Sequence, residues 1–125
     1  MELQKTNLDG CFLIKKDLFK DQRGFFTETY NKKDFDEVLN IDRNFVQDNL
    51  SVSHKGVVRG LHYQIKNPQG KLVRVVKGSV YDVAVDLRED SNTFGKWYGV
   101  ELNDKNMHQL WIPEGFAHGF MVLSE

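Results

Sequence analysis

Short segments rich in β-branched and aromatic residues recur along the whole chain, and they constrain its fold more than any other feature. Such residues favour the pleated, half-buried surface of a β-strand. Gly, Asn, Asp or Pro residues bound most of the segments, which is typical of strands joined by turns. The segments predict strands at 11–15, 24–30, 44–51, 57–65, 71–78, 79–88, 96–102 and 118–123. Many short strands of this kind indicate an all-β sandwich, barrel or jelly roll.

One segment, NKKDFDEVL, has the period of a helix. Phe35, Val38 and Leu39 fall on one helical face, and Asn31 can cap the first turn. We therefore expect a single short helix near 31–39.

Size and charge narrow the function classes. With 125 residues and no linker, repeat or low-complexity block, the chain is expected to form one domain over 1–125. Its 17 basic and 18 acidic residues give a formal net charge of -1, which leaves no basic field for nucleic acid. No apolar run approaches the ~18–20 residues of a membrane span, and the start MELQKTNLDG is too polar for a signal peptide. We expect a soluble, cytoplasmic protein that binds neither nucleic acid nor membranes.

The single cysteine agrees with a reducing compartment, because Cys11 has no partner for an internal disulfide. It lies in the apolar run CFLIK, where a thiol usually acts as a small buried hydrophobe. We expect Cys11 in the core.

The segment from Val80 to Leu87 alternates between two faces. Asp82, Ala84 and Asp86 share the face opposite the apolar one. That face is either wet, as in many antiparallel sheets, or lines a polar pocket inside a barrel. The local pattern does not choose between them.

Several polar residues interrupt strand-like stretches where no turn explains them. Each alone is more often a surface or packing residue than a functional one. Their convergence on one cavity would change that interpretation. They are Arg23, Glu28, Gln47, Asn49, Arg59, His62, Gln64, Lys71 (after the turn NPQG) and His118.

The spacing of some of these residues has the frame of the two cupin motifs, and cupins are double-sheet jelly rolls with an interior cavity. The frame consists of Gly56-x5-His62-x-Gln64, Lys71-x6-Gly78 and Pro113-x-Gly115-x-x-His118. A metal-binding cupin would have a histidine at Gln64 and a glutamate at Lys71. A protonated lysine cannot bind a metal, so we expect no metal site and no cofactor.

A histidine and an ammonium group in one pocket suit proton removal next to a ketone. His62 can take the proton near neutral pH, and Lys71 can stabilise the enolate oxygen. The other polar residues would then hold a polar, phosphorylated substrate. Arg59 and His62 differ by three positions, so they reach one pocket only if Gly60 marks a bulge.

Five strings cover nearly the whole chain and closely resemble the dTDP-4-dehydrorhamnose 3,5-epimerases. They are FKDQRGFFTETYN, FVQDNLSVSHKGVVRGLHYQ, QGKLVRVVKGSVYDVAVDLR, SNTFGKWYGVELN and QLWIPEGFAHGFMVLSE. The resemblance implies a metal-free cupin jelly roll that epimerises C3 and C5 of dTDP-4-dehydro-6-deoxy-D-glucose through enolate chemistry. It also implies a homodimer with strand exchange between subunits.

The resemblance further implies residue roles. His62 corresponds to the proton-abstracting base and Lys71 to the lysine beside the keto oxygen. Arg59 would bind the diphosphate and His118 the substrate. Contacts with the nucleotide end or the pocket wall would come from Phe19, Arg23, Glu28, Gln47 and Asn49.

The family continues beyond the equivalent of Glu125, with a general-acid tyrosine and a carboxylate that pairs with the histidine; neither lies in this chain. We therefore expect a jelly roll that is incomplete at its C-terminus, impaired inversion and reduced stability. Asp82 is the candidate to orient His62 instead. The alternatives are a fragment that only binds dTDP-sugars, a related monoepimerase or ketoisomerase, and a metal-dependent cupin dioxygenase, against which Gln64 and Lys71 argue.

Overall fold

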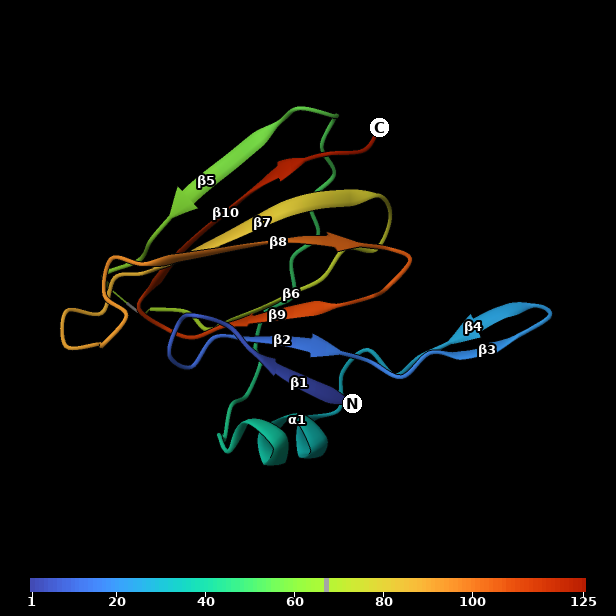
Figure 1. Ribbon diagram of the computed structural model, residues 1–125, viewed down its shortest axis with the longest axis horizontal. Coiled ribbons are helices and arrows are strands. Elements are labelled where there is room, and N and C mark those ends of the chain that lie inside the picture. Colours follow the sequence, from blue (N-terminus) through green and yellow to red (C-terminus); the bar gives the residue numbers. More distant parts are fainter. Residues whose placement is uncertain (67) are drawn as a thin grey trace.

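The computed structural model describes residues 1–66 and 68–125, so the first residue of the turn expected at 67–70 lies outside the described residues. The described part contains one helix, α1 (Lys32–Leu39), and short strands throughout (Figure 1). The strands are β1 (Glu2–Lys5), β2 (Phe12–Lys15), β3 (Phe19–Asp21), β4 (Gly24–Phe26), β5 (Val58–His62), β6 (Lys71–Val73), β7 (Ser79–Asp86), β8 (Trp97–Asn103), β9 (Gln109–Ile112) and β10 (Phe116–Val122).

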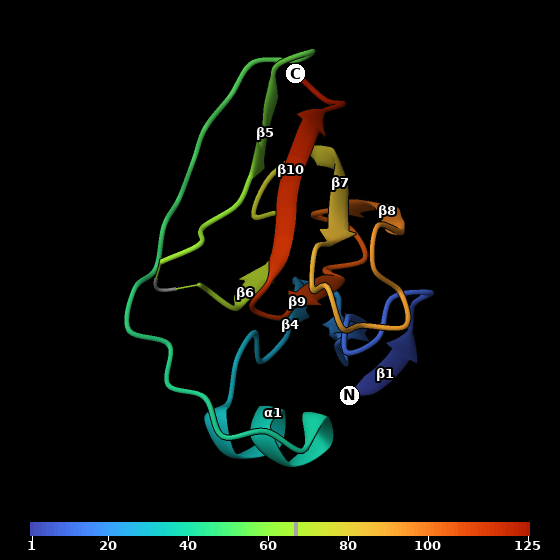
Figure 2. The same cartoon turned by 90° about the vertical axis from the view of Figure 1, so that its left-hand side faces the viewer.

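Eight of these strands form two antiparallel four-stranded sheets, in the orders β1-β2-β9-β6 and β5-β10-β7-β8. The edge strands β5 and β6 lie on the same side of the resulting sandwich (Figure 2). The remaining strands, β3 and β4, pair only with each other and form a hairpin that projects away from the sandwich (Figure 1). The predicted all-β, double-sheet architecture is confirmed.

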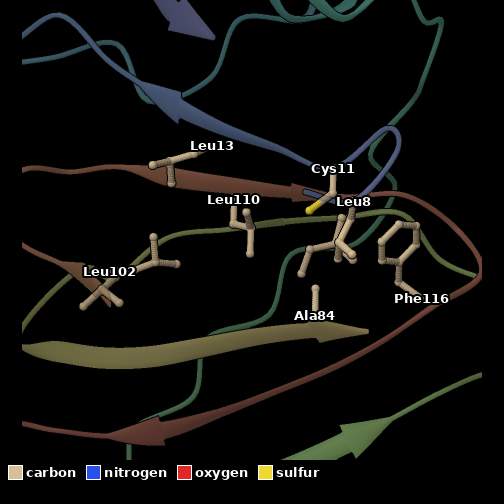
Figure 3. Close-up of a cluster of buried hydrophobic side chains, with 9 residues drawn as sticks. Leu8, Cys11, Leu13, Ala84, Leu102, Leu110 and Phe116 are labelled. Atoms are coloured by element: carbon tan, nitrogen blue, oxygen red, sulfur yellow. The ribbon is translucent and has the colours of Figure 1, made fainter. Parts of the chain in front are cut away.

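The main core lies between the two sheets (Figure 3). Leu13 and Leu110 come from one sheet, and Ala84 and Leu102 come from the other; each is at most 4% exposed. Cys11 belongs to the same cluster and is 1% exposed, which confirms the prediction of a buried thiol. Burial raises the pKa of Cys11 to about 12, since the low-dielectric core disfavours the thiolate.

Strand β7 turns its polar face inward. Asp82, Ala84 and Asp86 are each 0% exposed, so the face that the sequence left undecided points into the sandwich. Two buried carboxylates on one strand require hydrogen-bonding or charged partners from neighbouring segments.

The helix forms where the sequence predicts it. The Asn31 side chain accepts a hydrogen bond from the Asp34 backbone N–H at 3.2 Å, and Asn40 ends the helix in the left-handed conformation. Phe35 packs against Trp111 and so covers the outer face of the first sheet. No helix in residues 1–66 or 68–125 is long and apolar enough to cross a membrane.

Some predicted strands are wrong. Residues 44–51 form no strand, although their alternation is strand-like, and the segment 24–30 is a strand only over β4. Conversely, β1, β3 and β9 were not predicted. A strand requires a hydrogen-bonding partner, which a local pattern cannot supply.

Candidate active site

A pocket of about 490 Å³ opens where strands β5 and β6 approach the turn before β10. His62 and Lys71 both line it, as the sequence predicted. Its walls also include Tyr63, Gln64, Gln69 and Phe116. A base and a cation therefore share one cavity, although they come from opposite sheets.

His62 is exposed to solvent, and its strand register places it on the inner side of its sheet. It is the direct Cα partner of His118 on β10, which in turn pairs with Ala84 on β7. Directly opposed residues of an antiparallel pair project to the same side of the sheet. Ala84 belongs to the core, so both histidines lie on the inner side of this sheet.

The predicted bulge at Gly60 is confirmed. Between the pairs His118↔His62 and Phe120↔Arg59, strand β5 advances one residue further than β10. Gly60 has φ +101°, and a Cβ there would lie 2.7 Å from the His118 carbonyl oxygen. Only glycine fits this position, since a side chain would meet both strain and a backbone clash.

His118 and Asp82 form a buried pair. His118 Nε2 lies 2.7 Å from Asp82 Oδ1, so an ionised Asp82 accepts a hydrogen bond from it. Burial raises the pKa of the Asp82 carboxyl, while the His118 hydrogen bond and the positive charge of Lys71 act in the opposite direction. The positive charge of Lys71, which lines the pocket, therefore favours the ionised form of buried Asp82.

This pairing corrects one expectation. Asp82 was expected to orient His62, but its hydrogen bond goes to His118, and its other oxygen, Oδ2, has no partner among the described residues. The reason is register: Asp82 and His118 lie on adjacent strands, whereas His62 lies one strand further away.

The residues expected at the nucleotide end lie elsewhere in the single chain. Phe19 and Glu28 line a second groove of about 500 Å³, beside the β3–β4 hairpin and helix α1. Arg23 lies at the hairpin tip, where its exposed guanidinium pairs with Asp21 at 2.6 Å. These three residues do not converge with His62 within one chain.

The remaining expected contacts, buried His118 included, are also outside the pocket lining. Gln47 donates a hydrogen bond to Asn49 at 3.1 Å, and both lie on the exposed segment between α1 and β5, visible as the long trace at one side in Figure 2. Arg59 Nε donates to Ser53 Oγ at 2.8 Å. The bulge at Gly60 is thus present, but it does not bring the Arg59 side chain into the pocket lining.

Sequence reasoning did not single out five of the residues that line the pocket, all of them close in sequence to the predicted groups or to the second motif: Leu61, Tyr63, Pro68, Gln69 and Phe116. Proximity in sequence to a motif was the available signal for each. Among the described residues, no group of three or more His, Cys, Asp or Glu side chains could hold a metal ion.

The sequence model described as dTDP-4-dehydrorhamnose 3,5-epimerase matches residues 5–125. The chain belongs to this family.

Two members of the dTDP-4-dehydrorhamnose 3,5-epimerase family illustrate the similarity. The protein of that name from Methanothermobacter thermautotrophicus is 54% identical over 97% of the chain, and the one from Neisseria gonorrhoeae is 58% identical over 100% of it. The chain spans 65% of the length of the first relative and 38% of the second.

A solved structure of the family gives the same fold. The Legionella pneumophila dTDP-6-deoxy-D-glucose-3,5-epimerase, in complex with dTDP-4-keto-L-rhamnose, superposes with a TM-score of 0.95 at 53% identity. The superposition covers 98% of this chain and 65% of that one. The predicted fold class is confirmed, since the two sheets and the short helix correspond to the family's cupin fold.

Proposed function

We propose that the chain carries the proton-abstracting centre of a dTDP-4-dehydrorhamnose 3,5-epimerase. The substrate would be dTDP-4-dehydro-6-deoxy-D-glucose, and inversion at C3 and C5 would yield dTDP-4-dehydro-L-rhamnose. One observation carries the proposal: His62 and Lys71 line the same pocket. Family membership supports the choice of substrate.

The proposed reaction begins when His62 takes the proton from a carbon next to the 4-keto group. The electron pair left on that carbon moves toward the keto oxygen and forms an enolate. Lys71 stabilises the developing negative charge, because an ammonium group in a partly enclosed pocket acts more strongly than in water. Return of a proton from water to the opposite face inverts the carbon. The oxidation state does not change, so the proposed reaction needs no redox cofactor.

His118 would contact the substrate beside His62. Its ring is held by buried Asp82, which restricts the orientation that it can adopt. The pairing supports a binding role for His118, since a substrate oxygen would meet a fixed imidazole.

The hairpin residues would bind the nucleotide of a second subunit. Phe19 and Phe26 are 63% and 72% exposed on a hairpin that projects away from its own sandwich. Exposed aromatic rings and the free face of Arg23 suit a base and a phosphate. We propose a homodimer in which each hairpin, together with Glu28, completes the active site of the partner subunit. Arg59 would contact the diphosphate of the substrate.

The segment from 44 to 53 supports the dimer. Val46, Leu50 and Val52 alternate along it and are 92%, 77% and 87% exposed, which is costly for a free apolar edge. Pairing of this segment with a second copy would cover these side chains. Gln47 and Asn49 belong to the same segment, so pairing with a second copy would also change their positions.

Deuterium incorporation tests the catalytic proposal. The chain and the 4-keto sugar nucleotide are incubated in D2O, and deuterium at C3 and C5 is followed by NMR. We expect incorporation at both carbons, and His62→Asn should reduce it at least about a hundredfold. Lys71→Met should reduce it by about a hundredfold as well.

The matched controls are His54→Asn and Lys77→Met, which change the same residue types outside the pocket lining. If His62→Asn exchanges deuterium as fast as His54→Asn, the proposal fails. Binding of dTDP by calorimetry without any deuterium incorporation would favour the binding fragment. Incorporation at one carbon alone would favour a monoepimerase.

Sedimentation equilibrium tests the dimer. The wild-type chain should sediment as a dimer, and Leu50→Asp should produce monomers because a buried charge opposes pairing of the segment. Val76→Asp is the control, since Val76 is also exposed but lies outside the segment and lines neither the pocket nor the second groove. A wild-type chain that remains monomeric at high concentration contradicts the dimer and leaves the catalytic test unaffected.

A further inference from the structure

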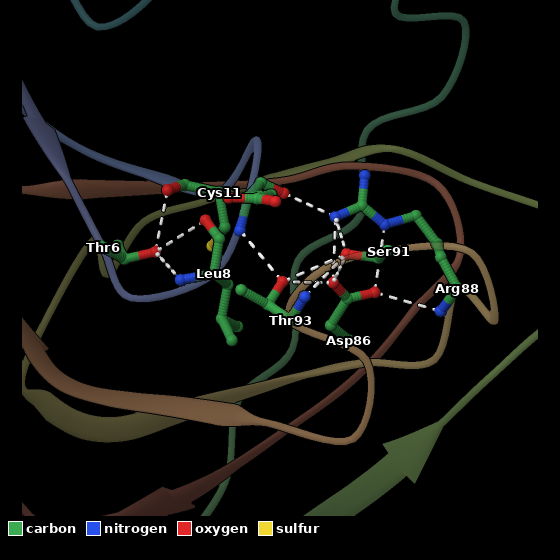
Figure 4. A network of polar contacts seen from close by, with 8 residues as sticks. Thr6, Leu8, Cys11, Asp86, Arg88, Ser91 and Thr93 are labelled. Carbon is green, nitrogen blue, oxygen red and sulfur yellow. Dashed lines mark hydrogen bonds and ion pairs between the residues drawn. The ribbon is translucent and has the colours of Figure 1, made fainter.

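A second buried carboxylate lies at the pocket end of β7 and is fully satisfied (Figure 4). Asp86 Oδ1 accepts hydrogen bonds from the Arg88 backbone N–H and Nε, both at 3.0 Å. Its Oδ2 accepts from Arg88 Nη2 at 2.9 Å and from the hydroxyls of Ser91 and Thr93, both at 2.6 Å. The backbone N–H and the two hydroxyls hold the carboxylate in place, and the carboxylate holds the guanidinium in one orientation through its bonds from Nε and Nη2.

The guanidinium held in this way packs against the pocket wall. The Arg88 Cζ lies 4.7 Å from the centroid of the Phe116 ring, within the range of a cation–π contact. A Cβ at Gly115 would lie 2.6 Å from Arg88 Cγ, so the chain passes closely over the arginine stem. Gly115 and Phe116 both line the pocket that holds His62 and Lys71.

The same arginine also connects this wall to the other sheet. Arg88 Nη2 donates to the Asp9 carbonyl at 2.6 Å, and the Asp9 N–H donates to Thr93 Oγ1 at 3.1 Å. Asp9 lies in the turn between β1 and β2, whereas Asp86 ends β7 in the opposite sheet. The network therefore joins both sheets at the end of the sandwich where the pocket lies.

We propose that Arg88, held by Asp86, is a positioning residue that fixes the Gly115–Phe116 wall of the pocket against His62 and Lys71. The inference rests on the proposed function. It deepens that function, because the wall opposite a proton-transfer group sets how the sugar ring approaches it. Displacement of reacting groups by about 1 Å can cost about a hundredfold in rate.

Kinetics of Arg88→Met test the proposal, because methionine keeps an apolar stem but loses the charge and all side-chain donors. We expect kcat to fall at least about tenfold, with the Kd for dTDP changed by no more than about twofold. The double variant D86N/R88M removes the buried charge together with its partner and carries the same expectation. It keeps the test usable if the single variant fails to fold.

The matched control is Asp104→Ala at the opposite end of β7. Asp104 Oδ2 accepts from the Gly78 N–H at 2.9 Å, so it holds a turn of the same sheet away from the pocket. Both variants are measured at a temperature where each is folded. A kcat of Arg88→Met equal to that of Asp104→Ala overturns the positioning role, as does a loss of dTDP affinity that parallels the loss of kcat.

A second readout does not depend on turnover. The imidazole signal of His62 in proton–carbon NMR should shift in Arg88→Met and not in Asp104→Ala, with the His54 signal as the internal reference. An unmoved His62 signal overturns the proposal. If the wild type shows no deuterium incorporation, the proposed function fails on its own, and the His62 signal still decides whether Arg88 holds the wall.

Discussion

Replacement of His118 by phenylalanine would test how much the fold depends on the partner of a carboxylate that is buried between the sheets. Asp82 is 0% exposed, and His118 supplies the one hydrogen bond that the described residues give its side chain. Phenylalanine fills much of the same space, so the variant removes the hydrogen bond and leaves little cavity. Asp82 Oδ1 then joins Oδ2 as a buried oxygen without a partner.

The expected loss of unfolding free energy is about 3 kcal/mol. Removing one partner of a buried pair typically costs about 3–5 kcal/mol. The lower value applies because the positive charge of Lys71 also favours the ionised form of Asp82. Replacing both partners, in D82N/H118F, should recover part of the loss, since an amide is less costly to bury than a charge.

The pH dependence of stability has a definite sign. Burial raises the pKa of folded Asp82 above its ordinary value of 3.8, and loss of His118 raises it further. The folded variant then keeps a proton that the unfolded chain has released. The contribution of protonated Asp82 to the free energy of unfolding is therefore fully present below pH 3.8. It is lost as the pH rises through the pKa of Asp82 in the folded state. The slope approaches about 1.4 kcal/mol per pH unit in that window.

Urea unfolding followed by tryptophan fluorescence, from about pH 4 to about pH 8, measures both quantities. The stability of the wild type should also fall as the pH rises, but over a narrower pH range. The reason is that the His118 hydrogen bond and the charge of Lys71 offset part of the effect of burial on the pKa of Asp82. A loss below about 1 kcal/mol, or a variant that gains stability as the pH rises, would refute this reasoning.

Three further predictions concern stability and reactivity. Gly60→Ala should lower the free energy of unfolding in urea by about 2–4 kcal/mol. Gly95→Ala, at a similar positive φ but with nothing within 4 Å of its Cβ, should lower it by only about 1 kcal/mol. Equal losses would exclude the backbone clash at Gly60. Native Cys11 should react with a thiol reagent only as fast as the chain unfolds, since burial raises its pKa to about 12, and labelling within the mixing time would contradict this. Asn31→Ala should lower stability by about 1 kcal/mol and Asn31→Asp should not, as urea midpoints will report; identical midpoints would exclude the side-chain cap.

Local features of the chain predicted much of the fold. Helix α1 follows from residues within one turn of each other: the Asn31 cap and the apolar face of Phe35. Cys11 is buried because its own segment is apolar. In each case the physical cause acts over a few residues.

Other features depend on partners distant in sequence. The segment 44–51 alternates like a strand but pairs with no strand among the described residues. Asp82 pairs with a histidine 36 positions away rather than with His62. The nucleotide-end residues were expected to meet the catalytic pair, yet Phe19 and Glu28 line a separate groove. No local pattern encodes which strands become neighbours.

The sequence by itself determined the types of groups available for chemistry: a histidine base, a lysine in a position where a cupin has a metal ligand, and an alternating strand with two carboxylates. Tertiary structure alone decided how they combine. Strand order assigned Asp82 to His118, and contact between the two sheets brought His62 and Lys71 to one pocket. The end of β7 became the support of that pocket through Asp86 and Arg88. The physical reason is that residue type is a local property, whereas charge pairing and burial depend on which distant segments pack together.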